Sequence, residues 1–229
     1  LLQMLVDSVQ HNGSPCTYFY DDTLLRVVLP YTHNIGDTET VRVYYHGVPQ
    51  IDQQGLGWGG FYFQSGYAYN LGVGFDANPH NYGRVWFPCF DNFVERSTYT
   101  IGITTNSGKL AYCGGTLLAD NTDMNGNRTR TWELTQPIPT YLASVAVAAY
   151  TEVNQTFTGQ LLNHPVKLVA LPADTTNLKN SFINLENAFD AFENRFGPYR
   201  WSRVGFVLVP FNSGAMEHAT NIAYPRAFA

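Results

Sequence analysis

The chain has 229 residues, of which 45% are hydrophobic, 15% aromatic and 14% charged, a composition that indicates a folded globular protein and excludes a disordered or coiled-coil chain. Its net charge of −5 comes from 18 acidic and 13 basic residues without long runs, which argues against nucleic acid as a partner. No stretch approaches the ~20 consecutive apolar residues that span a bilayer, so we expect no membrane span.

Up to about residue 156, short apolar runs alternate with turn signals, which predicts an all-β region. Strands are expected at 6–9, 24–29, 40–45, 97–104, 109–116, 128–134 and 142–150. Asn12-Gly13 is a typical hairpin turn. Residues 55–83 combine eight glycines with many aromatic side chains, which indicates tight bends and close backbone approaches and excludes a regular helix.

The pattern changes after Gly159. A strand is expected at 166–171, a helix at 178–196 that ends at Gly197-Pro198, and a buried strand at 204–209. The helix presents apolar side chains at spacings of three or four, namely Leu178, Phe182, Leu185, Phe189, Phe192 and Phe196. We therefore predict two domains, 1–157 and 158–229, divided in the polar stretch near 157–164.

The sequence lacks the common motifs that would by themselves indicate a catalytic site. None of the six histidines is followed by glutamate or lies four residues from another histidine, so no zinc-binding helix is expected. A serine-nucleophile elbow and a phosphate-binding loop are also absent. Cys89 and Cys113 lie in apolar, strand-like segments, where packing is a better explanation than nucleophilic catalysis.

Four segments together carry a family resemblance. The run Gly214-Ala215-Met216-Glu217-His218 resembles the Gly-x-Met-Glu-Asn exopeptidase signature of the M1 zinc aminopeptidases. Arg84, with Trp86-Phe87-Pro88-Cys89-Phe90-Asp91, resembles the family's Arg-x-x-Phe-Pro-Cys-Phe-Asp segment. Residues 137–142 and 196–199 are also similar to family segments. The resemblance implies a mainly β fold, with a β-sandwich followed by the incomplete α+β start of a thermolysin-like domain.

The resemblance also implies a role for each residue of the signature. Glu217 would pair with the free α-amine of a peptide substrate, because a carboxylate that meets an ammonium group favours chain ends over internal peptide bonds. Gly214 and Ala215 are small enough for the substrate backbone to approach. Met216 would be core or pocket wall. Peptides are therefore the expected substrates, and hydrolysis of their N-terminal residues the expected activity.

Two positions depart from the family pattern. His218 stands where the family has asparagine. The family also supplies a Gln or Glu from the sandwich domain as a second partner of the amine, and Asp76 is the best substitute in the corresponding stretch here. These departures favour an alternative, a catalytically inactive M1-like scaffold or binding protein. A third interpretation is a carbohydrate-binding β-sandwich that uses the aromatic residues of 58–82.

The family's zinc ligands and catalytic groups normally follow the Gly-x-Met-Glu-Asn segment. The resemblance therefore implies that the chain is trimmed at both ends, that zinc belongs to the full-length protein, and that this chain binds no metal and holds no catalytic residue. Secreted, periplasmic or cell-envelope locations are favoured over a cytoplasmic one.

Overall fold

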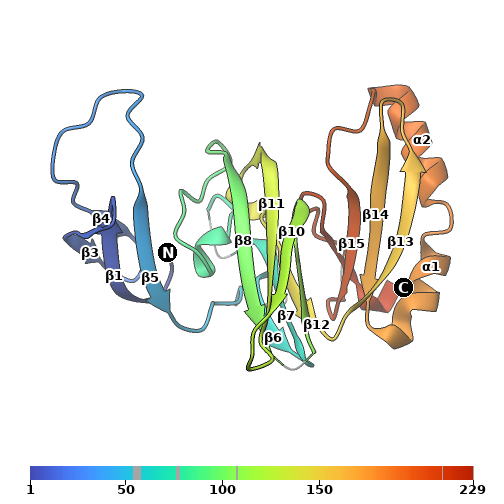
Figure 1. Ribbon diagram of the computed structural model, residues 1–229, viewed down its shortest axis with the longest axis horizontal. Helices are drawn as coiled ribbons and strands as arrows, with labels where there is room; N and C mark the ends of the chain where they lie inside the picture. The colour runs from blue at the N-terminus through green and yellow to red at the C-terminus, as the bar shows by residue number, and fades with distance from the viewer. Residues whose placement is uncertain (54–57, 76–77, 107, 213, 229) are drawn as a thin grey trace.

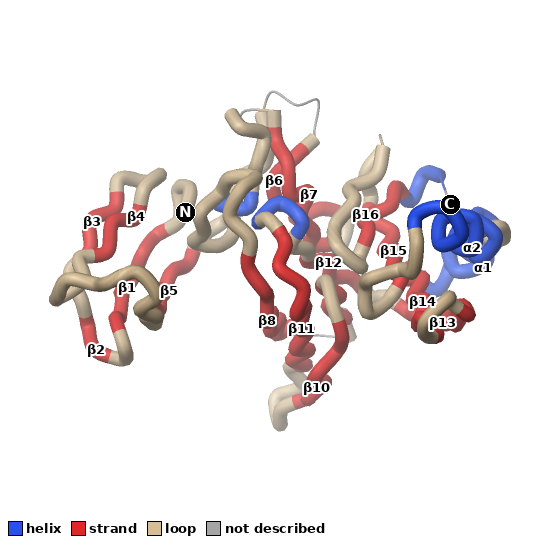
Figure 2. The backbone as a smooth tube through the Cα atoms, turned by 90° about the horizontal axis from the view of Figure 1, so that it is seen from above, coloured by secondary structure: helices blue, strands red, loops and turns tan. Residues whose placement is uncertain are grey.

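The computed structural model describes residues 1–53, 58–75, 78–106, 108–212 and 214–228. Figure 1 shows three parts in a row that follow the order of the chain: a small group of strands at the N-terminal end, a central pair of sheets, and a sheet covered by helices at the C-terminal end. Figure 2 shows the same succession from above, with the two longer helices on the outer side of the last sheet.

The N-terminal part consists of two small sheets. They contain β1 (Leu5–His11), β2 (Ser14–Pro15), β3 (Tyr18–Tyr20), β4 (Leu25–Val27) and β5 (Val41–His46). One sheet has the order β2-β1-β5, and the other pairs β3 with β4. β1 and β2 meet at Asn12-Gly13, where φ is +47° and +84°. Positive φ at both central residues is what a type I′ hairpin turn requires.

The central part is a β-sandwich. One sheet has the order β6-β7-β12-β9 and the other β10-β11-β8. Their strands are β6 (Gly59–Gln64), β7 (Tyr67–Gly74), β8 (Ser97–Thr105), β9 (Leu110–Cys113), β10 (Thr116–Thr122), β11 (Arg128–Ile138) and β12 (Val145–Ala148). Trp132 of β11 and Tyr112 of β9 are both buried, and their ring centroids are 5.6 Å apart. The two sheets thus share one aromatic core, and the predicted fold class is confirmed.

The C-terminal part is a four-stranded sheet of order β13-β14-β15-β16. It contains β13 (Thr151–Thr158), β14 (Asn163–Ala170), β15 (Val204–Val209) and β16 (Ile222–Pro225), with α1 (Thr175–Ser181) and α2 (Leu185–Phe196) on one face. Short 3₁₀ turns lie at Gly83–Val85, Thr140–Leu142, Pro172–Asp174 and Arg226–Phe228. In the described part of the chain, no helix is both long and apolar enough to cross a membrane.

Strand alternation explains how this sheet is buried on both faces. Leu168 and Leu208 pack in the same cluster as Leu178 and Phe189 of the helices. Val207, next to Leu208 in β15, packs instead in the core of the sandwich. Because successive side chains of a strand point to opposite faces, one sheet can join the helices on one side to the sandwich on the other.

Three sequence predictions need correction or comment. The helix expected at 178–196 is two helices, because Phe182 leaves the helix and packs against Phe206 and Tyr224 of the sheet, with centroids 4.4 and 5.1 Å away. The strand expected at 109–116 is split between β9 and β10, with Gly115 at φ +87°. Residues 151–157, assigned to the first domain, pair with β14 in the C-terminal sheet. The domain division itself stays a prediction.

Candidate functional site

The Gly214–His218 segment lies beside β16, the edge strand of the C-terminal sheet. Met216 forms an antiparallel bridge with Ala223, with N···O distances of 2.9 Å and 3.0 Å between the two backbones. Met216 is fully buried, whereas the next residue, Glu217, is exposed. The bridge therefore fixes an extended backbone whose side chains alternate between core and surface.

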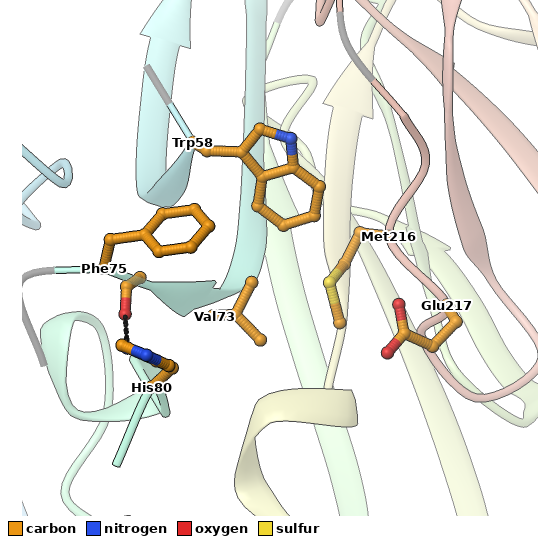
Figure 3. Close-up of a pocket in the computed structure, with 7 residues that line it drawn as sticks. Trp58, Val73, Phe75, His80, Met216 and Glu217 are labelled. Atoms are coloured by element: carbon orange, nitrogen blue, oxygen red, sulfur yellow. Dashed lines mark hydrogen bonds between the residues drawn. The ribbon is translucent and has the colours of Figure 1, made fainter. Parts of the chain in front are cut away.

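The side chain of Glu217 lines a pocket between the sandwich and the C-terminal sheet. The pocket has a volume of about 290 Å³ and is lined by Trp58, Val73, Gly74, Phe75, His80, Met216 and Glu217. Figure 3 shows Met216 and Glu217 on one side, and Trp58, Val73, Phe75 and His80 from the sandwich on the other. The walls are apolar, and the carboxylate of Glu217 is the one acidic group among these lining residues.

The sandwich side of the pocket is held by hydrogen bonds from two neighbouring segments. Nδ1 of His80 donates to the Gly74 carbonyl at 3.2 Å, and the His80 ring lies 5.5 Å from the ring of Phe75. The backbone N–H of Phe75 donates to the carboxylate of Asp52, which is buried. These contacts fix the end of β7 where it faces Glu217.

The carboxylate of Glu217 has no hydrogen-bond or ion-pair partner in the described residues. Its charge acts on Tyr141, whose pKa is raised, first by burial and then by the negative charge of Glu217. An exposed carboxylate with no partner among the described residues is suited to bind a cationic group through a charge-assisted hydrogen bond.

His218 points the other way, into the protein. It is 1% exposed, and its Nε2 accepts a hydrogen bond from Asn70 Nδ2 at 3.4 Å. Burial lowers the pKa of His218 to about 3, so the ring is neutral near pH 7. His218 therefore supports the segment from behind and does not line the pocket.

The remaining predicted site residues are less closely involved. Gly214 and Ala215 are exposed and do not line the pocket. Gly214 has φ +76°, a conformation that favours glycine, and a Cβ there would lie 3.7 Å from the side chain of Trp58. Asp76 lies outside the described residues, so the predicted second carboxylate is neither placed nor excluded; Phe75, which precedes it, does line the pocket.

The Arg84–Asp91 segment has a structural role. Asp91 accepts hydrogen bonds from the backbone N–H groups of Gly83 and Arg84 at 3.3 Å and 3.1 Å, and from the Thr140 hydroxyl at 2.6 Å. It thereby ties the 3₁₀ turn at Gly83–Val85 to the one at Thr140–Leu142. Burial raises the pKa of Cys89 to about 12, which agrees with a packing role.

The sequence identified one wall of the pocket and missed the other. The Met216 and Glu217 side followed from a five-residue pattern, whereas Trp58, Phe75 and His80 come from a stretch interpreted only as tight bends. Its aromatic density was the available signal, but nothing in the sequence showed that it faces Glu217. Among the described residues, no group of three His, Cys, Asp or Glu side chains with metal-ligand spacing lines this pocket. The described lining residues of this pocket therefore do not by themselves fit a catalytic zinc ion.

Comparisons with known proteins agree with this architecture. Residues 6–142 match the model of the peptidase M1 N-terminal domain. Over 137 residues, the chain is 26% identical to aminopeptidase B of Mus musculus and 25% identical to that of Rattus norvegicus. Each match covers 59% of this chain and 20% of the relative.

Solved structures extend the similarity to the C-terminal part. An M1 zinc metallopeptidase mutant from Deinococcus radiodurans, bound to a Tyr-Ser-Ala substrate, has a TM-score of 0.85 and 25% identity over 99% of this chain and 51% of its own. Aminopeptidase A of Legionella pneumophila, in complex with aspartic acid, has a TM-score of 0.78 at 18% identity and covers 97% of this chain, 26% of its own; this shows the fold alone. The chain thus spans about half of the first structure and about a fifth of the curated relatives.

Proposed function

This chain belongs to the M1 peptidase family, and from that premise we propose that it is part of a zinc aminopeptidase that removes N-terminal residues from peptides. In this proposal the chain supplies the anchor for the substrate's α-amine through Glu217. The zinc ion and its ligands belong to the full-length protein and are not supplied by the residues of this pocket.

The observation that carries the proposal is the carboxylate of Glu217, which lies at a sheet edge beside an apolar pocket and has no partner in the part of the chain that the structure describes. A free peptide N-terminus carries an ammonium group, which forms a charge-assisted hydrogen bond with a carboxylate. An internal peptide bond carries no such charge. Binding at Glu217 would therefore select the end of a chain and fix where the first peptide bond lies.

The walls of the pocket suit the side chain of that first residue. Trp58, Phe75 and Met216 provide apolar and aromatic contact, and the volume of about 290 Å³ is just below the usual range of ligand pockets, about 300–1,000 Å³. The pocket is lined by residues from both the sandwich and the C-terminal part. Both parts would therefore contribute to the selectivity for the N-terminal residue of the peptide.

The role of zinc in the family is to activate water and polarise the peptide carbonyl. The residues of this chain contribute differently, since they bind the amine, orient the peptide along the edge beside β16, and exclude water with the aromatic walls. Extended peptides commonly bind to an open sheet edge through their backbone. The Deinococcus relative was solved with a Tyr-Ser-Ala substrate, which supports a peptide ligand here.

The alternative of an inactive M1-like scaffold depends on two departures from the family pattern, His218 and the missing Gln or Glu for which Asp76, outside the described residues, is the best substitute. His218 is buried against Asn70 and does not line the pocket. A histidine in place of asparagine therefore affects the packing of the segment directly and substrate binding only indirectly. An inactive family member would still bind an amine at Glu217 but would not hydrolyse the peptide.

The test uses the full-length protein that carries these residues, assayed on aminoacyl arylamides with and without a metal chelator. We expect chelator-sensitive turnover, and about a 100-fold loss of kcat/KM in Glu217→Gln, the scale of losing a hydrogen bond between charged groups. Glu186→Gln, an exposed change on α2, is the matched control. Chelator-resistant or absent turnover, or a Glu217→Gln variant as active as the control, contradicts the proposal.

A further inference from the structure

A second polar cluster lies in the N-terminal part, at the C-terminal end of β1. His11 is the last residue of β1 and is buried, whereas His33 and Glu39 lie in the 28–40 loop between β4 and β5. Nε2 of His11 is 2.7 Å from Oε2 of Glu39, and Nδ1 of His33 is 3.0 Å from Oε1 of the same carboxylate. One ligand atom from each residue lies within 4.8 Å of the other two.

The surroundings hold this cluster in place. Nδ2 of Asn12 donates to Oε2 of Glu39 at 2.6 Å, and Oδ1 of Asn12 accepts from the Thr40 backbone N–H at 3.0 Å. The ring of Tyr31 lies 5.7 Å from that of His11 and 4.8 Å from that of His33. Hydrogen-bonded carboxylates and packed rings of this kind are what orient the ligands of protein metal sites.

The loop residue His33 lacks hydrogen-bond partners for its ring nitrogens among the described residues. Both ring nitrogens of His33 are inaccessible to solvent and have no hydrogen-bond partner within the described ranges. Nδ1 is close to Glu39 but not aligned with it as a hydrogen bond. Buried polar nitrogens without partners are costly, and a ligand at the centre of the cluster would satisfy Nδ1.

We infer that His11, His33 and Glu39 form a binding site for a divalent transition-metal ion, with zinc as the expected occupant, which fastens the 28–40 loop to the end of β1. Two imidazole nitrogens and one carboxylate oxygen form a ligand set that zinc accepts, whereas calcium and magnesium prefer oxygen alone. Water would complete a tetrahedral site. Zinc ligands at about 2.0–2.2 Å from the ion lie about 3.4 Å apart. The ligand atoms lie 2.7 and 3.0 Å apart in the two histidine–glutamate pairs and within 4.8 Å of one another overall, so shifts of about 0.5 to 1.5 Å would reach this geometry.

This site is independent of Glu217 and of the zinc proposed for the full-length enzyme. It also departs from the expectation that this chain binds no metal. That expectation came from the family resemblance and from the absence of histidines at helical spacing, and neither can detect ligands that a loop brings together.

The experiment uses the 229-residue chain, stripped of metal with a chelator and carrying Cys16→Ser to remove a partly exposed thiol in the N-terminal part as a competing ligand. Zinc chloride is titrated by calorimetry, and Co²⁺ is used to report coordination by its visible absorption. We expect saturable binding of one equivalent, a four-coordinate Co²⁺ spectrum, and a higher Tm in the presence of zinc.

His33→Ala and Glu39→Gln should each weaken binding by at least about tenfold and abolish the zinc-dependent rise in Tm. His46→Ala is the matched control, because His46 pairs with Asp7 at 2.9 Å in the same part but is exposed and outside the cluster. If alanine disturbs the fold by circular dichroism, His33→Cys tests the site instead, since it keeps a ligand and should add a sulfur-to-cobalt absorption band. The absence of saturable binding to the parent chain, or equal affinity in Glu39→Gln and His46→Ala, overturns the proposal.

Discussion

Nε2 of His218 accepts a hydrogen bond from Nδ2 of Asn70 at 3.4 Å, so the residue after Glu217 is fastened to strand β7 of the sandwich. The Asn70 side chain also donates to the Ala143 carbonyl at 2.9 Å and accepts from the Val145 N–H at 2.7 Å. One buried amide thus joins three segments. Because Glu217 and His218 are adjacent, the packing of His218 sets the position of the carboxylate in the pocket.

The first prediction concerns pH. Burial lowers the pKa of His218 to about 3 in the native state, while the unfolded side chain titrates near a pKa of about 6.5. Between these values the unfolded chain binds a proton that the native state excludes, so the free energy of unfolding falls as the pH falls, by about 1.4 kcal/mol per unit. Protonation of His218 in the unfolded chain should therefore lower the free energy of unfolding by about 2 kcal/mol when the pH falls from 7 to 5.

Urea unfolding at pH 7 and pH 5 measures this contribution. His218→Asn, which places the family's residue at this position, should show a smaller loss of stability on acidification than the parent chain. His46→Asn, a change at an exposed histidine, should leave the loss unchanged. Equal pH dependence in His218→Asn and the parent would show that His218 is not held neutral by the fold.

The second prediction concerns Arg203, which is buried where the C-terminal sheet meets the sandwich. Its guanidinium donates to the Thr220 carbonyl at 2.9 Å and the Cys113 carbonyl at 2.5 Å, and lies 4.5 Å from the ring of Trp132. Burial lowers its pKa to about 10, so it remains charged at neutral pH. Arg203→Ala should reduce the free energy of unfolding by about 3 kcal/mol, because two buried carbonyls lose their donor and a cavity remains.

The control for that measurement is Arg26→Ala. Arg26 pairs with Asp21 at 3.5 Å and both are well exposed, so its removal should change stability by less than about 1 kcal/mol. A loss in Arg203→Ala no larger than in Arg26→Ala would mean that the buried guanidinium contributes little to holding the two parts together.

The third prediction concerns the three free cysteines. Burial raises the pKa values of Cys89 and Cys113 to about 12, so at pH 8 only about one thiol in 10⁴ is ionised at either position. A disulfide reagent that attacks thiolates should modify one thiol rapidly in the native chain and three in denaturant. Cys16→Ser should remove the rapid phase, and a rapid phase of two or three thiols would contradict the raised pKa values of Cys89 and Cys113.

The sequence predicted those features that depend on local pattern. Alternation and turn residues located most strands, and the stop at Gly197-Pro198 located the end of α2. β13 was missed because it is an edge strand with mostly polar, exposed residues, and an edge strand needs little apolar surface. The helix break at Phe182 was missed because the cause is packing against Phe206, which a periodicity cannot reveal.

The candidate sites also differ in whether a local sequence pattern could predict them. Glu217 could be found because its role lies in a contiguous signature, and its assignment as an amine anchor stays a prediction. The facing residues Trp58 and His80 are more than 130 positions away in sequence, and only the fold brings them to the same pocket. The cluster at His33 has no sequence spacing that marks it, since its members meet through a hairpin turn and a loop.

The last prediction separates binding from stability at Glu217. Because its carboxylate is exposed and has no partner in the part of the chain that the structure describes, Glu217→Gln should change the free energy of unfolding by less than about 0.5 kcal/mol. In the same 229-residue chain, an amino-acid amide should perturb the indole resonance of Trp58 in NMR titrations, whereas its N-acetyl form, which lacks the positive charge, should bind more weakly. Glu217→Gln should reduce this preference for the free amine. A preference that survives the substitution would mean that another group binds the amine, and a large loss of stability would mean that Glu217 serves the fold.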